Sequence, residues 1–559
     1  MNARPTLDGQ HFDVLVIGGG INGVAIAREC ARAGRRTLLI EQHDFASGTT
    51  SRSTRIIHGG LRYLEQFDFA QVRESLRERQ TLVRQYPQLV RPLQFLLTLD
   101  GSSRRSALAI RAGLWLYRQM GGARLALDGH AEKNRLERLL DAGRRFTIFS
   151  FEDAQCEFPE RLVAEWLVEA LRAGCQARNH TRLLEVSTSN GRATGAVLHD
   201  ELDGRESKVD ASWIINATGP WADMVCTSSG VHTATPMVGG VRGSHIVLPR
   251  FAGAPEAAVY TEAVDGRPIF VVPWSEQILV GTTEVPDESD PSQARPSANE
   301  TEYLLRSLRR LFPQVRVSSG DVRYAFAGIR PLPYTPQSRP LAITRRHFFH
   351  DHAAEGAAGM ISLIGGKLTT AASAARECAK KIGIATTDLP CVAVADESDL
   401  QKLTVRAVTQ IAEIASVNHE SAAAIHEWFG ARSPEIAQKA RDNSKLSQPL
   451  CPHTRHIVAE AVDAFENQCA VTLADVLLRR VPVALGRCWS AECSRMAALQ
   501  VACAMGWNGA RLASEHEQFE AECESFLQKR IALPGVTSGS HATDAQQRST
   551  AHTKTSGSV

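Results

Sequence analysis

Residues 12–63 constrain the fold of this chain more than any other stretch. An apolar run at residues 14–17 leads directly into Gly18, Gly20 and Gly23, which are followed by a helical pattern of apolar residues. The spacing G-x-G-x-x-G between a strand and a helix is typical of a dinucleotide-binding βαβ unit. The first glycine permits the tight turn, the second lets backbone approach a pyrophosphate, and the third packs helix on strand. The helix N-terminus then offers N–H groups and a positive dipole end to the phosphates.

A second apolar run, residues 37–40, ends at Glu41. An acid about 20 residues past the glycines accepts hydrogen bonds from the ribose hydroxyls of an adenosine. It would also repel a 2′-phosphate, so NADP is disfavoured. A Gly-rich turn in an ordinary α/β domain is the competing explanation. Strand, helix and acid together favour a dinucleotide but leave open which one.

Small and hydroxyl-bearing residues follow Glu41, among them Thr49, Thr50, Ser51 and Ser53. Such a run suits a cofactor that lies extended, because hydroxyl and backbone N–H groups can bind its pyrophosphate and ribityl chain. NAD does not need this segment, whereas FAD does. The run therefore favours FAD.

The composition indicates a large globular protein. At 559 residues and 60.9 kDa the chain is long enough for two or three domains. A net charge of +2 gives no overall bias towards nucleic acid, so we expect no nucleic-acid partner. No apolar run approaches the ~20 residues that a membrane span needs, and residues 1–11 are too polar and short for a signal peptide.

The 12 cysteines form no C-x-x-C pair, and the nearest neighbours are Cys488 and Cys493. Scattered cysteines in a large chain usually remain reduced and buried. We therefore expect neither a disulfide framework nor a metal site. His541 and His552 are too isolated to suggest one.

Several motifs carry a resemblance to a known family. Residues 58–65 read His-Gly-Gly-Leu-Arg-Tyr-Leu-Glu, and residues 216–221 read Asn-Ala-Thr-Gly-Pro-Trp. Further matches are Gly-Ser-His-Ile at 243–246, Gly-Ile-Arg-Pro at 328–331, Gly-Gly-Lys-Leu-Thr-Thr at 365–370 and Ala-Asp-Val-Leu-Leu-Arg-Arg at 474–480. With the glycines and Glu41, they make the chain resemble the FAD-dependent, quinone-linked glycerol-3-phosphate dehydrogenases, within the D-amino-acid-oxidase-like flavoproteins. One segment departs from the family, which usually carries paired acids where this chain reads Gln-Cys-Glu-Phe-Pro-Glu-Arg-Leu at 155–162.

The expected fold is α/β, with a Rossmann-type FAD-binding domain, an antiparallel-sheet substrate domain and a C-terminal α-helical domain. We assign residues 12–85, 146–237 and 341–385 to the FAD-binding domain, and residues 86–145 and 238–340 to the substrate domain. Short strand patterns between turns support the antiparallel sheet. Residues 391–533 have a helical pattern, and the Ser/Thr/Gly/His-rich tail at 534–559 should be disordered.

The motifs and the resemblance together predict the cofactor contacts. They are Gly18, Gly20, Asn22, Gly23, Glu41, Thr49, Thr50, Ser51, Ser53, His58, Gly59, Gly60, Gly219, Gly366, Lys367, Leu368 and Thr369. The helix that we expect to start near Leu368 would direct its positive dipole end at the flavin ring.

Oxidising a secondary alcohol at a flavin requires a base for the hydroxyl proton and cations that anchor the substrate. Arg62 and Arg330 are candidate phosphate ligands, since a guanidinium matches phosphate oxygens bidentately. Ion pairing is the competing explanation for either arginine. Tyr63 could add a hydroxyl to the phosphate.

Histidine titrates nearest neutral pH, which makes His58 and His245 the candidates for proton transfer. We favour His245 as base and as a substrate contact, with His58 against the flavin, although the two roles could be exchanged. Lys367 could bind a substrate oxygen and balance the charge of the reduced flavin. A solvent-exposed lysine is the competing explanation, which the helix dipole disfavours.

Residues 103–124 read as a helix on which Arg104, Arg111 and Arg118 recur at every seventh position, with Trp115 beside them. A basic amphipathic helix with an aromatic residue is typical of a membrane-surface contact, and an ordinary surface helix is the alternative. The resemblance favours the membrane.

The resemblance implies an enzyme, peripheral on the cytoplasmic face of the inner membrane, that oxidises sn-glycerol 3-phosphate and reduces a membrane quinone. Alternatives are an oxidase that uses O2, an enzyme for another phosphate- or carboxylate-bearing substrate, and a flavin-binding protein without turnover. The chain could also form a homodimer.

Overall fold

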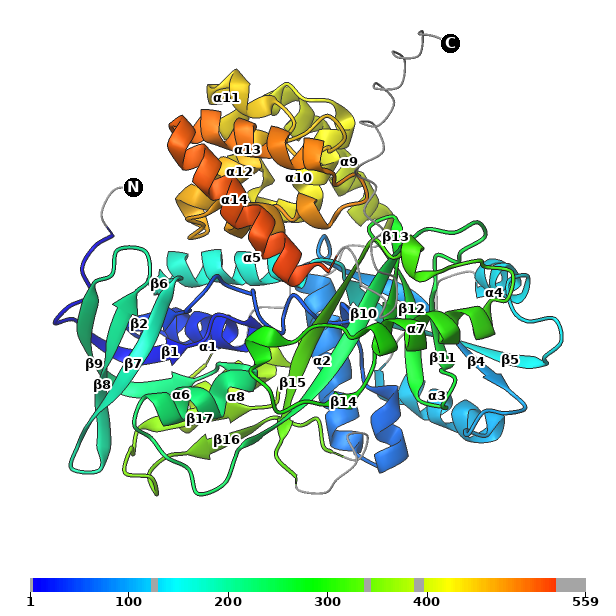
Figure 1. Cartoon of the computed structure of the whole chain (residues 1–559), viewed down its shortest axis with the longest axis horizontal. Coiled ribbons are helices and arrows are strands. Elements are labelled where there is room, and N and C mark those ends of the chain that lie inside the picture. Colours follow the sequence, from blue (N-terminus) through cyan, green and yellow to red (C-terminus); the bar gives the residue numbers. More distant parts are fainter. Residues whose placement is uncertain (1–3, 122–128, 336–342, 387–396, 529–559) are drawn as a thin grey trace, which may run out of the picture.

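The computed structural model describes residues 4–121, 129–335, 343–386 and 397–528. Two β-sheets, each with helices packed against it, lie side by side, and a bundle of helices sits over one edge of both (Figure 1). The predicted fold class is confirmed. The expected disordered tail, residues 534–559, lies outside the described residues.

The first sheet carries the Gly-rich turns. Its strand order is β16-β17-β9-β1-β2-β6, and β8 extends it from β9 and pairs with β7. The strands are β1 (His11–Ile17), β2 (Thr37–Ile40), β6 (Gln176–Arg178), β7 (Thr181–Ser189), β8 (Arg192–Asp200), β9 (Glu206–Asn216), β16 (Phe348–Asp351) and β17 (Met360–Ile364). The pairings among β17, β9, β1, β2 and β6 are parallel. Strands β2 and β17 are buried along their whole length, as expected for parallel strands covered on both faces.

One face of this sheet is covered by α1 (Ile21–Arg32), which packs against both α5 (Pro159–Arg172) and α8 (Ala371–Lys381). Gly23 permits the close approach of α1, because a Cβ there would lie 1.8 Å from the carbonyl oxygen of Gly18. Helix α8 begins at Ala371, three residues later than the sequence predicts, because residues 368–370 form a turn.

The second sheet has the order β14-β10-β13-β12-β11-β4-β5-β3, and β15 pairs with β10. Its strands are β3 (Ile56–Ile57), β4 (Val90–Asp100), β5 (Phe146–Cys156), β10 (Val238–Pro249), β11 (Ala258–Glu262), β12 (Pro268–Trp274), β13 (Gln277–Gly281), β14 (Val285–Pro286) and β15 (Tyr324–Pro333). All pairings are antiparallel except β11 with β4. The sequence assigns residues 146–156 to the cofactor domain, but β5 pairs with β4 along its full length. We therefore propose a division in which β3 and β5 belong to the substrate domain.

Helices flank this second sheet. They are α2 (Phe69–Gln85), α3 (Ala107–Gly121), α4 (Gly129–Glu137) and α7 (Ala298–Leu311), with a short 3-10 turn η1 (Leu61–Gln66) before α2. A capping box between Ser297 and Glu300 fixes the start of α7. Helix α6 (Ala222–Ser228) follows β9 on the first sheet.

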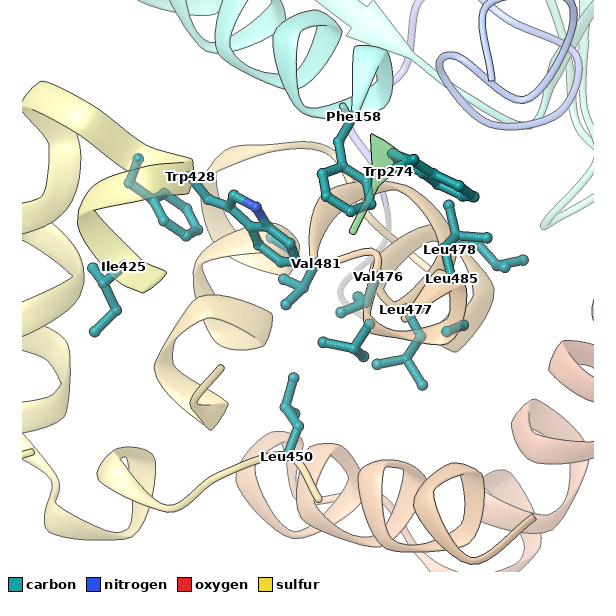
Figure 2. Packing of buried hydrophobic residues seen from close by; sticks show 14 of the residues in the cluster. Phe158, Trp274, Ile425, Trp428, Leu450, Val476, Leu477, Leu478, Val481 and Leu485 are labelled. Atoms are coloured by element: carbon teal, nitrogen blue, oxygen red, sulfur yellow. The ribbon is translucent and has the colours of Figure 1, made fainter. Parts of the chain in front are cut away.

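The C-terminal bundle comprises α9 (Glu397–Ala415), α10 (His419–Phe429), α11 (Ser433–Asp442), α12 (Val458–Asn467), the π-helical turn η8 (Asp475–Arg480), the 3-10 turn η9 (Val483–Leu485), α13 (Ala491–Met505) and α14 (Gly509–Phe526). Figure 2 shows its apolar contact with the rest of the molecule, where Phe158 lies between Trp274 of β12 and Trp428 of α10. The ring centroids are 6.1 Å and 5.4 Å apart. Among the described helices, none is both long and apolar enough to cross a membrane.

Candidate active site

A cavity of about 580 Å³ lies where β1, β2 and β9 end at their carboxyl ends. Ligands of open parallel α/β sheets bind at this edge. Eleven of the predicted cofactor contacts line it, namely Gly18, Gly20, Asn22, Glu41, Thr49, Thr50, Ser53, Gly219, Gly366, Lys367 and Leu368. Segments from four distant parts of the chain therefore meet around one space.

The Gly18 turn has the backbone conformation that only glycine adopts without strain. Its φ is +103°, and a Cβ would lie 2.8 Å from the carbonyl oxygen of Ala217. The turn thus places the N-terminus of α1 at the cavity without side chains in between. This is the geometry that phosphate groups bind.

The Glu41 carboxylate lies at the cavity beside this turn. It accepts hydrogen bonds from the backbone N–H groups of Gly19 at 2.7 Å and His43 at 2.9 Å. Burial raises the pKa of Glu41, and the two N–H groups act against that shift. The donors fix the carboxylate at the point where a ribose would meet it.

The hydroxyl run divides into two groups. Thr49, Thr50 and Ser53 line the cavity, and the Thr50 hydroxyl accepts from the backbone N–H of Ile21 at 3.1 Å. Ser51 does not line it, because its hydroxyl is buried and donates to the carbonyl oxygen of Gly48 at 3.1 Å. The Thr49 hydroxyl donates to the carbonyl oxygen of Ile329 at 2.9 Å and so ties the run to β15, next to Arg330.

The other end of the cavity is formed by the second Gly-rich turn, residues 365–368. Gly365 and Gly366 have φ of +81° and +94°, which again require glycine. Thr369 does not line the cavity, but its hydroxyl accepts from the backbone N–H of His58 at 3.2 Å. This contact joins the turn to the loop that carries His58, Gly59 and Gly60.

Part of the cavity wall has no counterpart in the sequence prediction. It includes Thr181, Arg182, Leu183 and Leu184 from β7, Trp221, and Met224, Val225 and Ser228 from α6. Trp221 ends the Asn-Ala-Thr-Gly-Pro-Trp motif, which was the available signal, whereas the β7 residues belong to no motif.

Lys367 lies at the cavity with its amine 4.0 Å from the ring centroid of Tyr63. The amide oxygen of Gln71, in the orientation that its neighbours favour, accepts from the same amine at 2.8 Å. Burial lowers the pKa of Lys367 to about 7. The amine is therefore not the solvent-exposed lysine of the competing explanation, and its charge depends on pH near neutrality.

His245 lies on β10 of the second sheet, where its side chain is buried. Its Nε2 is 2.9 Å from the Thr54 hydroxyl, and its ring stacks on Phe326 with centroids 5.1 Å apart. Burial, together with the positive charges of Arg330 and Arg55, lowers the pKa of His245 to about 3. The imidazole is therefore neutral at physiological pH, as a base must be, but it is weakly basic before a substrate binds.

Arg330 lies on β15 opposite Val241 of β10. Its guanidinium donates to the Thr282 hydroxyl at 2.9 Å and to the carbonyl oxygen of Thr283. Pro331, the next residue, lines the cavity. The side chain of Arg62 lies outside the described residues, so its predicted contact with a phosphate remains a prediction.

Asp153 of β5 is a positioning residue that no motif indicated. One of its carboxylate oxygens accepts from the backbone N–H of Gly59 at 3.0 Å, from the Tyr117 hydroxyl at 2.7 Å and from Arg79 at 2.8 Å. Burial raises the pKa of Asp153, and these donors oppose that shift. The loop from His58 to Gly60 is thereby held to β5, to α2 and to α3.

The predicted basic stripe is only partly present. Helix α3 begins at Ala107, so Arg104 lies before it. The prediction was wrong for Arg104, because Glu262 and Asp265 bind it to the β11–β12 turn instead. Arg111 and Arg118 do lie on α3, where Trp115 is 64% exposed.

Comparison with known proteins identifies the family. Residues 13–372 match the family model described as FAD dependent oxidoreductase. The chain belongs to this family. Residues 360–512 match the model for the C-terminal domain of alpha-glycerophosphate oxidase.

Relatives extend the match over most of the chain. A glycerol-3-phosphate dehydrogenase of Synechocystis sp. is 36% identical over 508 residues, which cover 87% of this chain and 91% of that protein. The aerobic glycerol-3-phosphate dehydrogenase of Escherichia coli is 33% identical over 66% of this chain and 73% of that protein. The solved glycerol-3-phosphate dehydrogenase of Bacillus halodurans, complexed with FAD, has the same fold, with a TM-score of 0.72 at 22% identity over 94% of this chain and 97% of that one. The chain thus lies within the glycerol-3-phosphate dehydrogenase and oxidase branch of the FAD-dependent family.

The protein uses FAD, and its cavity fits this cofactor. Two glycine turns bring backbone to the cavity without side chains, and a fixed carboxylate lies at one end. The Oδ1 atom of Asn22 is buried at the cavity wall without a hydrogen-bond partner among the described residues. A buried polar atom of this kind requires a partner, which a bound cofactor can supply.

Proposed function

We propose that the protein oxidises sn-glycerol 3-phosphate to dihydroxyacetone phosphate and passes the electrons to a membrane quinone. The observation that carries this proposal is the 36% identity with a glycerol-3-phosphate dehydrogenase over 91% of that relative's length. The structure adds a cofactor cavity with Lys367 at its wall and Arg330 next to a wall residue.

Arg330, Arg62 and Tyr63 would bind the phosphate, and Lys367 would bind a substrate oxygen. The hydroxyl proton would pass to the imidazole of His245, which is neutral and therefore able to accept it. FAD, when bound, supplies the acceptor for the hydride that leaves C2. Loss of that proton and that hydride converts the C2 alcohol to a ketone. His58, whose backbone is fixed by Thr369, remains the alternative base.

The exposed face of α3 supports the membrane part of the proposal. Leu108 is 76% and Trp115 64% exposed, and Arg111 is exposed between them on the same helix. Helix α3 contacts η1, and Phe67, which follows η1, is 78% exposed. Exposed apolar side chains beside basic ones fit an interfacial helix. The proposed location is the cytoplasmic face of the inner membrane.

Anaerobic addition of sn-glycerol 3-phosphate to the purified yellow protein tests the proposal. We expect the flavin absorbance to bleach and to return when a soluble quinone analogue is added. An oxidised spectrum that persists with sn-glycerol 3-phosphate would refute the substrate. D-erythritol 1-phosphate is a suitable competitor, because a Brucella abortus relative that is 34% identical carries the name D-erythritol 1-phosphate dehydrogenase.

Aerobic peroxide detection separates the quinone-linked enzyme from an oxidase. We expect reoxidation by the quinone analogue to be much faster than by O2, with little peroxide formed. Stoichiometric peroxide with slow quinone reduction would instead establish the oxidase reaction.

A further inference from the structure

Three cysteines from separate segments meet in the C-terminal bundle. Cys451 lies in the loop closed by the bridge between Pro449 and Ile457, Cys488 follows η9, and Cys493 lies in the first turn of α13. Their sulfur atoms all lie within 4.8 Å of one another. The spacing along the chain gave no indication of this cluster, because Cys451 is distant in sequence from the other two.

We propose that these three sulfurs form a binding site for a thiophilic metal ion, with zinc as its representative. Thiolate ligands select ions of this kind. A zinc–sulfur bond of about 2.3 Å in tetrahedral geometry places two sulfurs roughly 3.8 Å apart. The three sulfurs lie within 4.8 Å of one another, so none of the separations exceeds that arrangement by more than about 1 Å.

The printed geometry shows how one of the thiols is held. The Cys493 thiol donates to the carbonyl oxygen of Cys488 at 3.2 Å, which ties the start of α13 to the segment that carries Cys488. Metal binding requires deprotonated thiols, so binding of the ion would release their protons to solvent.

The burial of the three cysteines indicates how an ion would reach the cluster and how many ligands it would have. Cys451 and Cys493 are buried, whereas Cys488 is half-buried and opens the cluster towards the surface. Within the part of the chain that the structure describes, the cluster offers three protein atoms. A water molecule would complete four-coordination on the open side.

Two simpler explanations do not account for the meeting of all three sulfurs. Buried free cysteines often serve as small apolar side chains, but that role does not require three sulfurs to face one another from three segments. A disulfide would join two of the sulfurs and leave the third without a function. The metal site uses all three.

A bound ion would fix the loop at 449–457 to the start of α13. The carbonyl oxygen of Leu485, three residues before Cys488, accepts from Gln277 at 3.0 Å and from the Tyr324 hydroxyl at 2.9 Å. The site would therefore stabilise the bundle close to its contact with the second sheet.

Zinc binding by the untagged, FAD-loaded, reduced protein tests the proposal. After removal of metal by a chelator, the protein is dialysed against Zn2+ and its zinc content is determined by elemental analysis. We expect one tightly bound zinc per chain. X-ray absorption at the zinc edge should show three sulfur neighbours at about 2.3 Å.

Cys488→Ser is the main variant, since a half-buried position tolerates the change best. It should weaken zinc binding at least tenfold while substrate still bleaches the flavin, which shows that the chain is folded. Cys503→Ser is the matched control, because Cys503 is exposed on α13 outside the cluster. His350→Asn controls for the group formed by His350, His352 and Glu355, and should leave the sulfur neighbours unchanged.

Three results would overturn the proposal. They are the absence of bound zinc, zinc surrounded by nitrogen and oxygen alone, and unchanged zinc affinity in Cys488→Ser. A disulfide between Cys451 and Cys488 in the freshly purified protein, found by mass spectrometry together with no zinc uptake after reduction, would identify a thiol pair instead.

Discussion

The hydroxyl of Thr54 lies 2.9 Å from Nε2 of His245, and it orients an imidazole whose other nitrogen, Nδ1, is buried without a hydrogen-bond partner among the described residues. Thr54 precedes β3, and His245 is central in β10. The contact therefore joins the loop that runs on to His58 with the strand that carries the proposed base.

Thr54→Val should remove this orienting contact without changing side-chain size. We expect the rate of flavin reduction by substrate to fall about tenfold while FAD remains bound. This loss is smaller than the full contribution of a positioned base, because Thr54 only orients it. Stopped-flow measurement of anaerobic flavin reduction gives the rate. Thr98→Val is the matched control, since its hydroxyl makes a buried 2.8 Å contact with Thr261 in the same sheet. An equal loss in both variants would mean that the effect is structural.

Arg330→Ala should weaken substrate binding and leave the FAD content unchanged. A charge-assisted hydrogen bond contributes about 1.5–3 kcal/mol, so KM should rise about 10- to 150-fold. Arg323→Ala, at an exposed position just before β15, should change KM little. If Arg330→Ala loses FAD, the residue supports the cofactor and not the substrate.

Lys367 should make substrate binding depend on pH near neutrality. Its pKa of about 7 means that the free amine is charged below pH 7 and neutral above it. A phosphate dianion favours the charged form, so affinity should decline by up to tenfold per pH unit above 7. Titration of the flavin spectrum with inorganic phosphate at pH 6–9 measures this. Lys367→Arg should flatten the profile, because arginine stays protonated; an unchanged slope would assign the titration to another group.

The buried pair of Arg55 and Glu160 should matter far more to stability than the exposed pair of Arg172 and Glu435, which also involves α5. The two side chains are fully buried and make two contacts of 3.0 Å. Glu160→Gln leaves the Arg55 charge unpaired, which costs about 3–5 kcal/mol. Glu435→Gln breaks the exposed pair with Arg172 and a longer contact of 3.6 Å with Arg432, which keeps Glu165 and Asp463 as partners, and should cost about 1 kcal/mol. Chemical denaturation followed by tryptophan fluorescence compares them, and similar losses would contradict the prediction.

Reversing charge on α3 should reduce membrane binding. Arg111→Glu combined with Trp115→Ala is expected to lower sedimentation with anionic liposomes several-fold, because both the basic and the apolar contributions are lost. Arg441→Glu lies on α11 at the opposite side of the molecule and is the control (Figure 1). Equal sedimentation of all three proteins would exclude α3 as the contact.

Local signals selected residues that the fold brings to one cavity. Glycine turns, an acid at a strand end and a hydroxyl run act through backbone geometry that is set within a few residues, and most of these residues line the cavity. Ser51 does not line the cavity, because its hydroxyl turns to the carbonyl oxygen of Gly48 while Thr49, Thr50 and Ser53 face the cavity. That choice depends on packing, which the sequence pattern does not contain.

Features that depend on distant partners could not be predicted. Nothing in residues 146–156 indicates that β4 is their neighbour, and Asp153 has its role only because α2, α3 and Gly59 converge on it. Arg104 shows the same limit, since Glu262 and Asp265 determine its position. Residues 155–162, which depart from the family pattern, contain Glu160. This residue has a structural role, because it pairs with Arg55 inside the protein.

The strand order has a consequence for how the chain reaches its native state. Strand β17 occupies residues 360–364, yet it pairs with β9, which in turn pairs with β1 at the N-terminus. The first sheet therefore cannot be completed on the ribosome until about two thirds of the chain has been made, and β15 then bridges to Gln528 near the end of the described chain. Such long-range pairing slows folding and leaves strand edges open in the interval. The proposed FAD cavity is lined by residues that follow β1 and residues that follow β17, so FAD present during synthesis should raise the yield of native protein.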